Sequence, residues 1–121
     1  MVIFDTNMIL RYLLDDNKEM AERAEQYLEN EGVSVTVEVI AEVVYVLKGV
    51  YQLQRDIIAS TVKGFLELAN CSESDSVRLA LDIFATHGLD FVDCILYAYH
   101  ICKGAQIATF DKKLLKLLAE A

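Results

Sequence analysis

Residues 89–114 read LDFVDCILYAYHICKGAQIATFDKKL, and this stretch carries the features that decide the fold. Its apolar positions predict a helix over residues 91–103, which begins beside Asp90 and Asp93 and ends at Gly104. The short apolar run at residues 106–109 predicts a strand, and Asp111 follows where that strand ends. A buried carboxylate without a partner is costly or takes up a proton. Acids at the ends of such apolar elements therefore indicate a bound cation, a shared proton or access to solvent.

The rest of the chain predicts short apolar strands among amphipathic helices. Met1–Phe4 is apolar without alternation, which is typical of a strand buried on both faces of a parallel sheet. Val33–Val35 predicts a second strand, Thr36 caps the helix after it, and Asn70-Cys71 leaves room for a rudimentary third strand. The predicted helices span residues 7–14, 17–31, 37–48, 54–69, 75–86, 91–103 and 112–119. This order predicts an α/β fold: a three-layer α/β/α sandwich with a short, mainly parallel central sheet.

Length and charge limit the classes of function. The 121 residues fit a single domain, residues 1–121, whose hydrophobic core is large enough to need no disulfide bonds or structural metal ions. The net charge of −8 argues against nonspecific binding of long duplex DNA, which depends on basic residues. It does not exclude a nuclease, because acids that hold a divalent cation present a positive ion to the substrate. No apolar run suits a membrane span and the N-terminus lacks the charged start of a signal peptide, so we expect a soluble, cytoplasmic protein.

The cysteine and histidine residues do not predict a zinc site. Cys71, Cys94 and Cys102 form no CxxC motif, and we interpret them as small buried hydrophobic residues. His87 and His100 have no cysteine or histidine at ligand spacing, so packing or a hydrogen bond is the better explanation for His100. Phosphate-binding glycine motifs and the GxSxG nucleophile motif are also absent from the sequence.

Four acids fall at matching positions of the predicted fold. Asp5 and Asp111 follow strands, Asp93 lies in the first turn of a helix, and Glu42 lies in the helix after the second strand. Sites in parallel sheets form beyond the carboxyl ends of the strands, where a hard cation such as Mg²⁺ would relieve repulsion among these acids. Such an ion activates water, so hydrolysis of a phosphodiester would need no histidine or serine nucleophile.

Each acid also has a purely structural explanation. Asp5, Asp90 and Asp111 each precede a predicted helix and would serve as its N-cap, and Glu42 would be one more solvated residue. The polar neighbours of the acids could support bound water or a carboxylate, with turn formation as an equal rival explanation; they are Thr6, Asn7 and Thr109.

At these residues the chain resembles a PIN domain, in particular the small VapC-like toxins of toxin–antitoxin pairs. The resemblance covers essentially the whole chain and rests on VIFDTN at residues 2–7, Glu42, LDFVDCILYA at residues 89–98 and IATFDKKL at residues 107–114. It implies a Mg²⁺ or Mn²⁺ site, endoribonuclease activity directed at single strands, a homodimer and a cognate antitoxin protein. The implied catalytic and metal-binding acids are Asp5, Glu42, Asp93 and Asp111, supported by Thr6, Asn7 and Thr109, with Asp90 less certain.

The chain differs from typical PIN domains at two of its predicted strands. Because the sequence ends at Ala121, we expect their final strand to be missing, and we expect the strand near Cys71 to be weak, so one sheet edge should be incomplete. An incomplete edge is a place where another chain can pair.

Two other functions remain open. One is a catalytically inactive PIN-like module that acts by binding a protein partner, an interpretation supported by the acidic net charge. The other is a phosphoacceptor receiver domain, which suits the length. The two helices between the first two predicted strands disagree with a receiver domain, as does the lack of a separate acidic pair after strand one.

Overall fold

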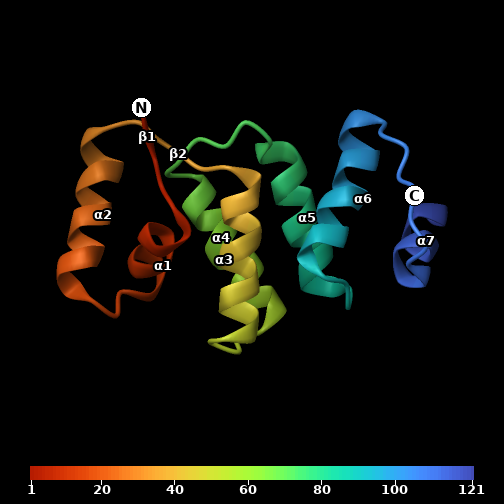
Figure 1. Cartoon of the computed structure of the whole chain (residues 1–121), viewed down its shortest axis with the longest axis horizontal. Coiled ribbons are helices and arrows are strands. Elements are labelled where there is room, and N and C mark those ends of the chain that lie inside the picture. Colours follow the sequence, from red (N-terminus) through yellow and green to blue (C-terminus); the bar gives the residue numbers. More distant parts are fainter.

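The computed structural model describes residues 1–121 and is mostly helical, with a small parallel sheet near the N-terminus (Figure 1). The elements in chain order are β1 (Val2–Ile3), α1 (Thr6–Leu14), α2 (Lys18–Asn30), β2 (Val33–Ser34), α3 (Val37–Gly49), α4 (Arg55–Leu66), α5 (Ser74–Thr86), α6 (Phe91–Lys103) and α7 (Lys112–Ala119). No helix is both long enough and apolar enough to cross a membrane.

Capping residues explain where several helices begin. The side chains of Asn17 and Thr36 accept hydrogen bonds from the backbone N–H groups of Met20 and Val39, at 3.0 and 3.2 Å. These bonds satisfy N–H groups that have no partner inside the helix. The predicted starts of α2 and α3 are therefore confirmed to within a residue or two.

The sheet is smaller than the sequence predicts. β1 pairs in parallel with β2, Val2 opposite Val33 and Ile3 opposite Ser34. The third strand is reduced to a single bridge between Ser34 and Asn70, which confirms that the chain near Cys71 forms only a rudimentary strand. The α/β class with a short parallel sheet is confirmed, whereas the three-layer sandwich stays a prediction.

The prediction that the first strand is buried on both faces is wrong. Phe4 is buried, but the side chain of Ile3 is 62 % exposed and that of Met1 is 93 % exposed. Neighbouring side chains of a strand point to opposite faces, so one face of β1 packs on the core and the other lies open.

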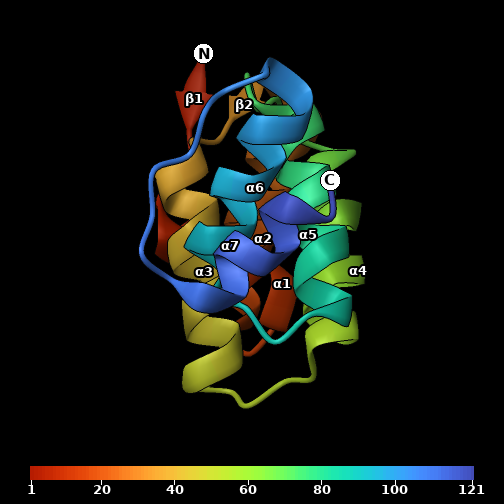
Figure 2. The ribbon, with the colours of Figure 1, turned by 90° about the vertical axis from the view of Figure 1, so that its right-hand side faces the viewer.

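The strand predicted at residues 106–109 does not form. After α6 the chain runs as an extended segment to α7, and Gln106–Phe110 make no backbone hydrogen bonds. α7 buries Leu114 and Leu117 and packs on α6 (Figure 2), which keeps this segment beside α6 and away from β1 (Figure 1). An apolar run alone does not reveal whether a sheet edge lies within its reach.

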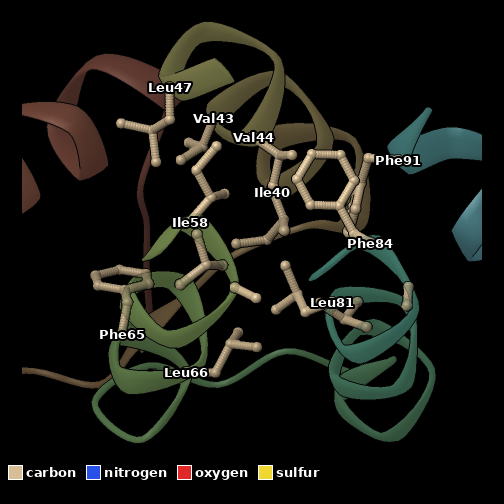
Figure 3. Packing of buried hydrophobic residues seen from close by; sticks show 14 of the residues in the cluster. Ile40, Val43, Val44, Leu47, Ile58, Phe65, Leu66, Leu81, Phe84 and Phe91 are labelled. Atoms are coloured by element: carbon tan, nitrogen blue, oxygen red, sulfur yellow. The ribbon is translucent and has the colours of Figure 1, made fainter. Parts of the chain in front are cut away.

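The core is formed mainly between helices. Side chains of α3, α4 and α5 meet in one apolar cluster, with Phe91 of α6 at its border (Figure 3). The labelled residues of this cluster are Ile40, Val43, Val44, Leu47, Ile58, Phe65, Leu66, Leu81, Phe84 and Phe91. This packing fixes α3, α5 and α6 relative to one another, and these helices carry the site described below.

Gly104 ends α6 in the left-handed conformation, with a φ of 68°. We expect Gly104→Ala to lower the free energy of unfolding by about 1 kcal/mol, because a Cβ disfavours this conformation although nothing lies within 4 Å of it. Gly88→Ala is the matched control, since its surroundings are equally open and its φ is not left-handed. Urea denaturation should show a change below about 0.5 kcal/mol for the control. Equal effects in both variants would contradict this explanation.

Candidate functional site

A cleft of about 400 Å³ lies between α3 and the start of α6. Tyr45 and Lys48 of α3 form part of its wall, and Asp90 and Asp93 lie at the other side. Tyr45 is 76 % exposed, so its ring is available to a ligand. The cleft thus combines an aromatic ring, a lysine and two carboxylates.

Arg55 fixes the loop that leads into α6. Its Nη1 donates to the carbonyl oxygens of Phe84, His87 and Leu89, at 3.1, 2.8 and 2.8 Å. The guanidinium also lies over the Phe84 ring, 4.3 Å from the ring centre. Asp90 follows this loop directly, so Arg55 is a positioning residue for the acids at the start of α6.

Reasoning from the sequence missed Arg55. It lies in the first turn of α4, where the positive end of the helix dipole disfavours a cation. An arginine at such a position therefore indicates that its guanidinium makes contacts outside its own helix.

Asp93 is the acid whose titration is most clearly perturbed. It is half-buried, and desolvation raises its pKa above the ordinary aspartate value. The negative charges of Asp111 and Asp90 raise that pKa further, in that order. Asp111 and Asp90 therefore each lie close enough to Asp93 to repel its carboxylate, and a group that binds there is favoured if it carries positive charge or a proton.

Two of the acids also cap helices, as their structural explanation predicts. Asp5 Oδ1 accepts a hydrogen bond from the Met8 N–H at 2.9 Å, and Asp111 Oδ1 accepts one from the Leu114 N–H at 2.8 Å. Thr109 supports Asp111, because its Oγ1 accepts a hydrogen bond from the Asp111 N–H at 3.0 Å. A carboxylate has further acceptor positions, so capping leaves room for a second role.

The prediction that Asp90 caps α6 is wrong. Asp90 occupies the N-cap position, but its side chain makes no capping hydrogen bond. It is exposed and borders the cleft instead, which leaves its carboxylate free for a ligand.

The chain does not gather all of the predicted site acids. Asp5 precedes α1, with Thr6 and Asn7 in its first turn, and Glu42 is exposed on α3; neither acid contributes to the shift of Asp93. No group of three or more histidine, cysteine, aspartate or glutamate side chains is arranged to hold a metal ion. In a single chain, the four predicted acids are therefore not placed to bind one metal ion together.

The cysteine and histidine interpretations are largely confirmed. Cys94 is buried, and burial raises the pKa of its thiol to about 12. His100 Nδ1 lies 2.8 Å from the Ala105 carbonyl oxygen, which is the hydrogen bond expected for it. The interpretation is wrong for Cys102, which is exposed in the last turn of α6, while Cys71 is half-buried.

The comparisons with known proteins give one match. The model of the PIN domain family matches residues 2–119 of the chain. No curated protein and no solved structure matches it.

Proposed function

Because the chain belongs to the PIN domain family, whose members are typically nucleases, we propose that it is an endoribonuclease acting on phosphodiester bonds of single-stranded RNA. The observation that carries the proposal is the close group of Asp90, Asp93 and Asp111 at the start of α6 and α7, two of which border an open cleft. Burial and the negative charges of Asp111 and Asp90 raise the pKa of Asp93, so a cation bound beside this carboxylate would relieve the repulsion.

The wall of the cleft suits a single strand. Tyr45 offers an exposed ring on which a base can stack, and Lys48 offers a positive charge for a phosphate. Stacking tolerates any base, so these two residues would hold the strand without selecting its sequence. A duplex, whose bases are already stacked, would lose this contact.

Nucleases of this family generally use divalent metal ions, and we propose Mg²⁺ or Mn²⁺ as the cofactor. Such an ion, when bound, neutralises charge on the phosphodiester and lowers the pKa of water. The resemblance implies Asp5, Glu42, Asp93 and Asp111 as the acids that hold it, with Thr6, Asn7 and Thr109 in support; of these acids, only Asp93 and Asp111 lie close together in a single chain. A cognate antitoxin protein that blocks the cleft is the partner proposed from the resemblance to VapC-like toxins.

The test is cleavage of a pool of cellular RNAs by the purified protein. We expect cutting with Mg²⁺ or Mn²⁺, loss of cutting with EDTA, and recovery when the metal is restored in excess. Single-stranded regions should be cut at least about ten times faster than duplex regions, because the stacking contact is lost in a duplex.

Absence of cleavage, with no binding of Mg²⁺ or Mn²⁺ in a titration, would contradict the proposal. It would favour the catalytically inactive module that binds a protein partner. Asp93→Asn, purified in parallel, shows whether any cutting comes from a contaminating nuclease.

A further inference from the structure

A second cleft, of about 390 Å³, lies between α7 and the loop that joins α5 to α6. Leu89 and Leu117 are buried and form an apolar part of its wall. Lys113 and Lys116 are exposed on α7 and line the same cleft. These lysines are three residues apart, so they lie on one face of the helix. We call this cleft, with its two lysines and two leucines, the lysine cleft.

The lysines of α7 have no counter-charge within the chain. α7 reads KKLLKLLA, so it carries three positive charges and no acid, in a protein with a net charge of −8. None of the three lysines forms an ion pair, whereas four other basic residues do: Arg11, Lys63, Arg78 and Lys103. The positive charge of the lysine cleft is therefore available to an anion from outside the chain.

The loop side of the lysine cleft is held in place by Arg55. Its Nη1 donates to the carbonyl oxygens of His87 and Leu89, and both of these residues line the cleft. A wall that is fixed before a ligand arrives lowers the entropy that binding costs. The lysine cleft is therefore a preformed site on its loop side.

The lysine cleft adjoins the acids of the candidate site. Leu89 lines the lysine cleft, and the next residue, Asp90, lines the cleft between α3 and α6. Asp111 directly precedes α7 and lies close enough to Asp93 to repel its carboxylate. Figure 2 shows the loop between α5 and α6 passing below α7. The two clefts thus meet at the loop that leads into the acids.

We propose that the lysine cleft binds a backbone phosphate of the RNA strand, an inference that rests on the proposed function and adds a second contact to it. Lys113 and Lys116 hold the phosphate on one side of the acids, and Tyr45 and Lys48 hold the strand on the other. Lysine binds phosphate as a point charge, whatever the base attached. Two anchors flanking the acids place the phosphodiester between them beside the carboxylates, which favours reaction through orientation.

An acidic segment of a partner protein is the other anion that could enter the lysine cleft. The adjoining cleft favours RNA, because the exposed ring of Tyr45 offers a stacking surface to a base. A nucleotide chain uses both clefts at once, through its base in one and its phosphate in the other. An acidic peptide uses only the lysines.

RNA binding tests the lysine cleft without reference to cleavage. The probe is a fluorescent oligouridylate of about 12 nucleotides, titrated with protein in EDTA and followed by anisotropy. We expect Lys113→Gln with Lys116→Gln to raise the Kd about tenfold at about 0.1 M salt. The slope of log affinity against log salt should become shallower by about 1.4, because each contact to a single-strand phosphate contributes about 0.7.

Lys112→Gln is the matched control for charge. Lys112 lies on the same helix and is exposed and unpaired, but it does not line the lysine cleft. Its Kd should change by less than about threefold, since no phosphate contact is lost. Lys113→Arg with Lys116→Arg keeps both charges and should bind as wild type does. An equal loss in Lys112→Gln would overturn the cleft and indicate diffuse attraction to the whole helix.

Glu120→Gln should act in the opposite direction. Glu120 lines the lysine cleft one turn after Lys116, where its charge repels a phosphate. Its neutralisation is expected to lower the Kd about twofold, a size typical of an exposed charge pair. Weaker binding in this variant would count against a phosphate in the cleft.

The outcomes separate the lysine cleft from the nuclease. RNA binding that depends on both lysines, in a protein that does not cut, would support the cleft and count against the nuclease. Cutting by wild type, with equal RNA binding in wild type and the double glutamine variant, would overturn the cleft while the nuclease stands. A labelled oligoglutamate that binds these lysines more tightly than the RNA would overturn the phosphate assignment in favour of an acidic protein segment.

Discussion

Replacing Asp93 by asparagine is expected to lower RNA cleavage at least about 100-fold while the protein stays folded. Asparagine keeps the size of the side chain but does not supply a negatively charged oxygen. Asp93 also has two further acids near it, Asp111 and Asp90, whose charges raise its pKa. The measurement is the initial rate of cleavage at saturating Mg²⁺, with circular dichroism to verify the fold.

The same variant should become more stable relative to wild type as pH rises. Desolvation and the neighbouring acids raise the pKa of Asp93 in the folded protein. The folded state therefore holds this proton more tightly than the unfolded state, and the resulting stability is lost as pH rises through the folded pKa. Asp93→Asn has no such group, so its melting temperature should match wild type near pH 3 and exceed it at pH 7.

Asp75→Asn is the matched control for both readouts. Asp75 is also an acid in the first turn of a helix, but it is exposed at the start of α5 and lines no part of the cleft. Its cleavage rate should stay within about twofold of wild type, as is usual for surface substitutions. Full activity in Asp93→Asn, or an equal loss in Asp75→Asn, would remove Asp93 from the site.

Replacing Arg55 by methionine is expected to lower the free energy of unfolding by about 2 to 4 kcal/mol, because charge-assisted hydrogen bonds are strong and the carbonyl groups left behind lose their donor. Methionine retains most of the apolar contact with Phe84. We also expect cleavage to fall at least about tenfold, since the loop before Asp90 would no longer be fixed. Urea denaturation and initial rates measure the two effects.

Arg78→Met provides the comparison for Arg55. Arg78 on α5 makes a 3.4 Å ion pair with the exposed carboxylate of Glu67, and exposed pairs of this kind contribute about 1 kcal/mol or less. A smaller loss of stability and an unchanged rate are expected for it. If Arg55→Met were no more harmful than Arg78→Met, the three carbonyl contacts would not support the loop as proposed.

The helices could be predicted because their limits depend on local chemistry. Asn17 and Thr36 cap α2 and α3, and Gly104 ends α6, as the sequence indicates. The strands could not be predicted as well, because pairing depends on where distant segments lie. IATF at residues 107–110 has the composition of a strand, yet α7 holds it beside α6, out of reach of β1.

Only part of the candidate site could be predicted from the sequence. Two of the predicted acids, Asp93 and Asp111, lie together, and the capping roles of Asp5 and Asp111 are confirmed. The separation of Asp5 from this pair depends on the arrangement of the whole chain, which a pattern of residues does not contain. Arg55 was missed because its partners are backbone carbonyl groups, and these have no signature in the sequence.

The packing of α4, α5 and α6 has a consequence for the order of folding. These helices are consecutive in the chain and pack chiefly on their immediate neighbours, so their contacts close short loops. The pairing of β1 with β2 instead closes a loop of about 30 residues, which costs more chain entropy. The helical part of the molecule should therefore form first, and the N-terminal strand should join late and open first. A nascent chain would thus expose its strand edge while its helices are already folded.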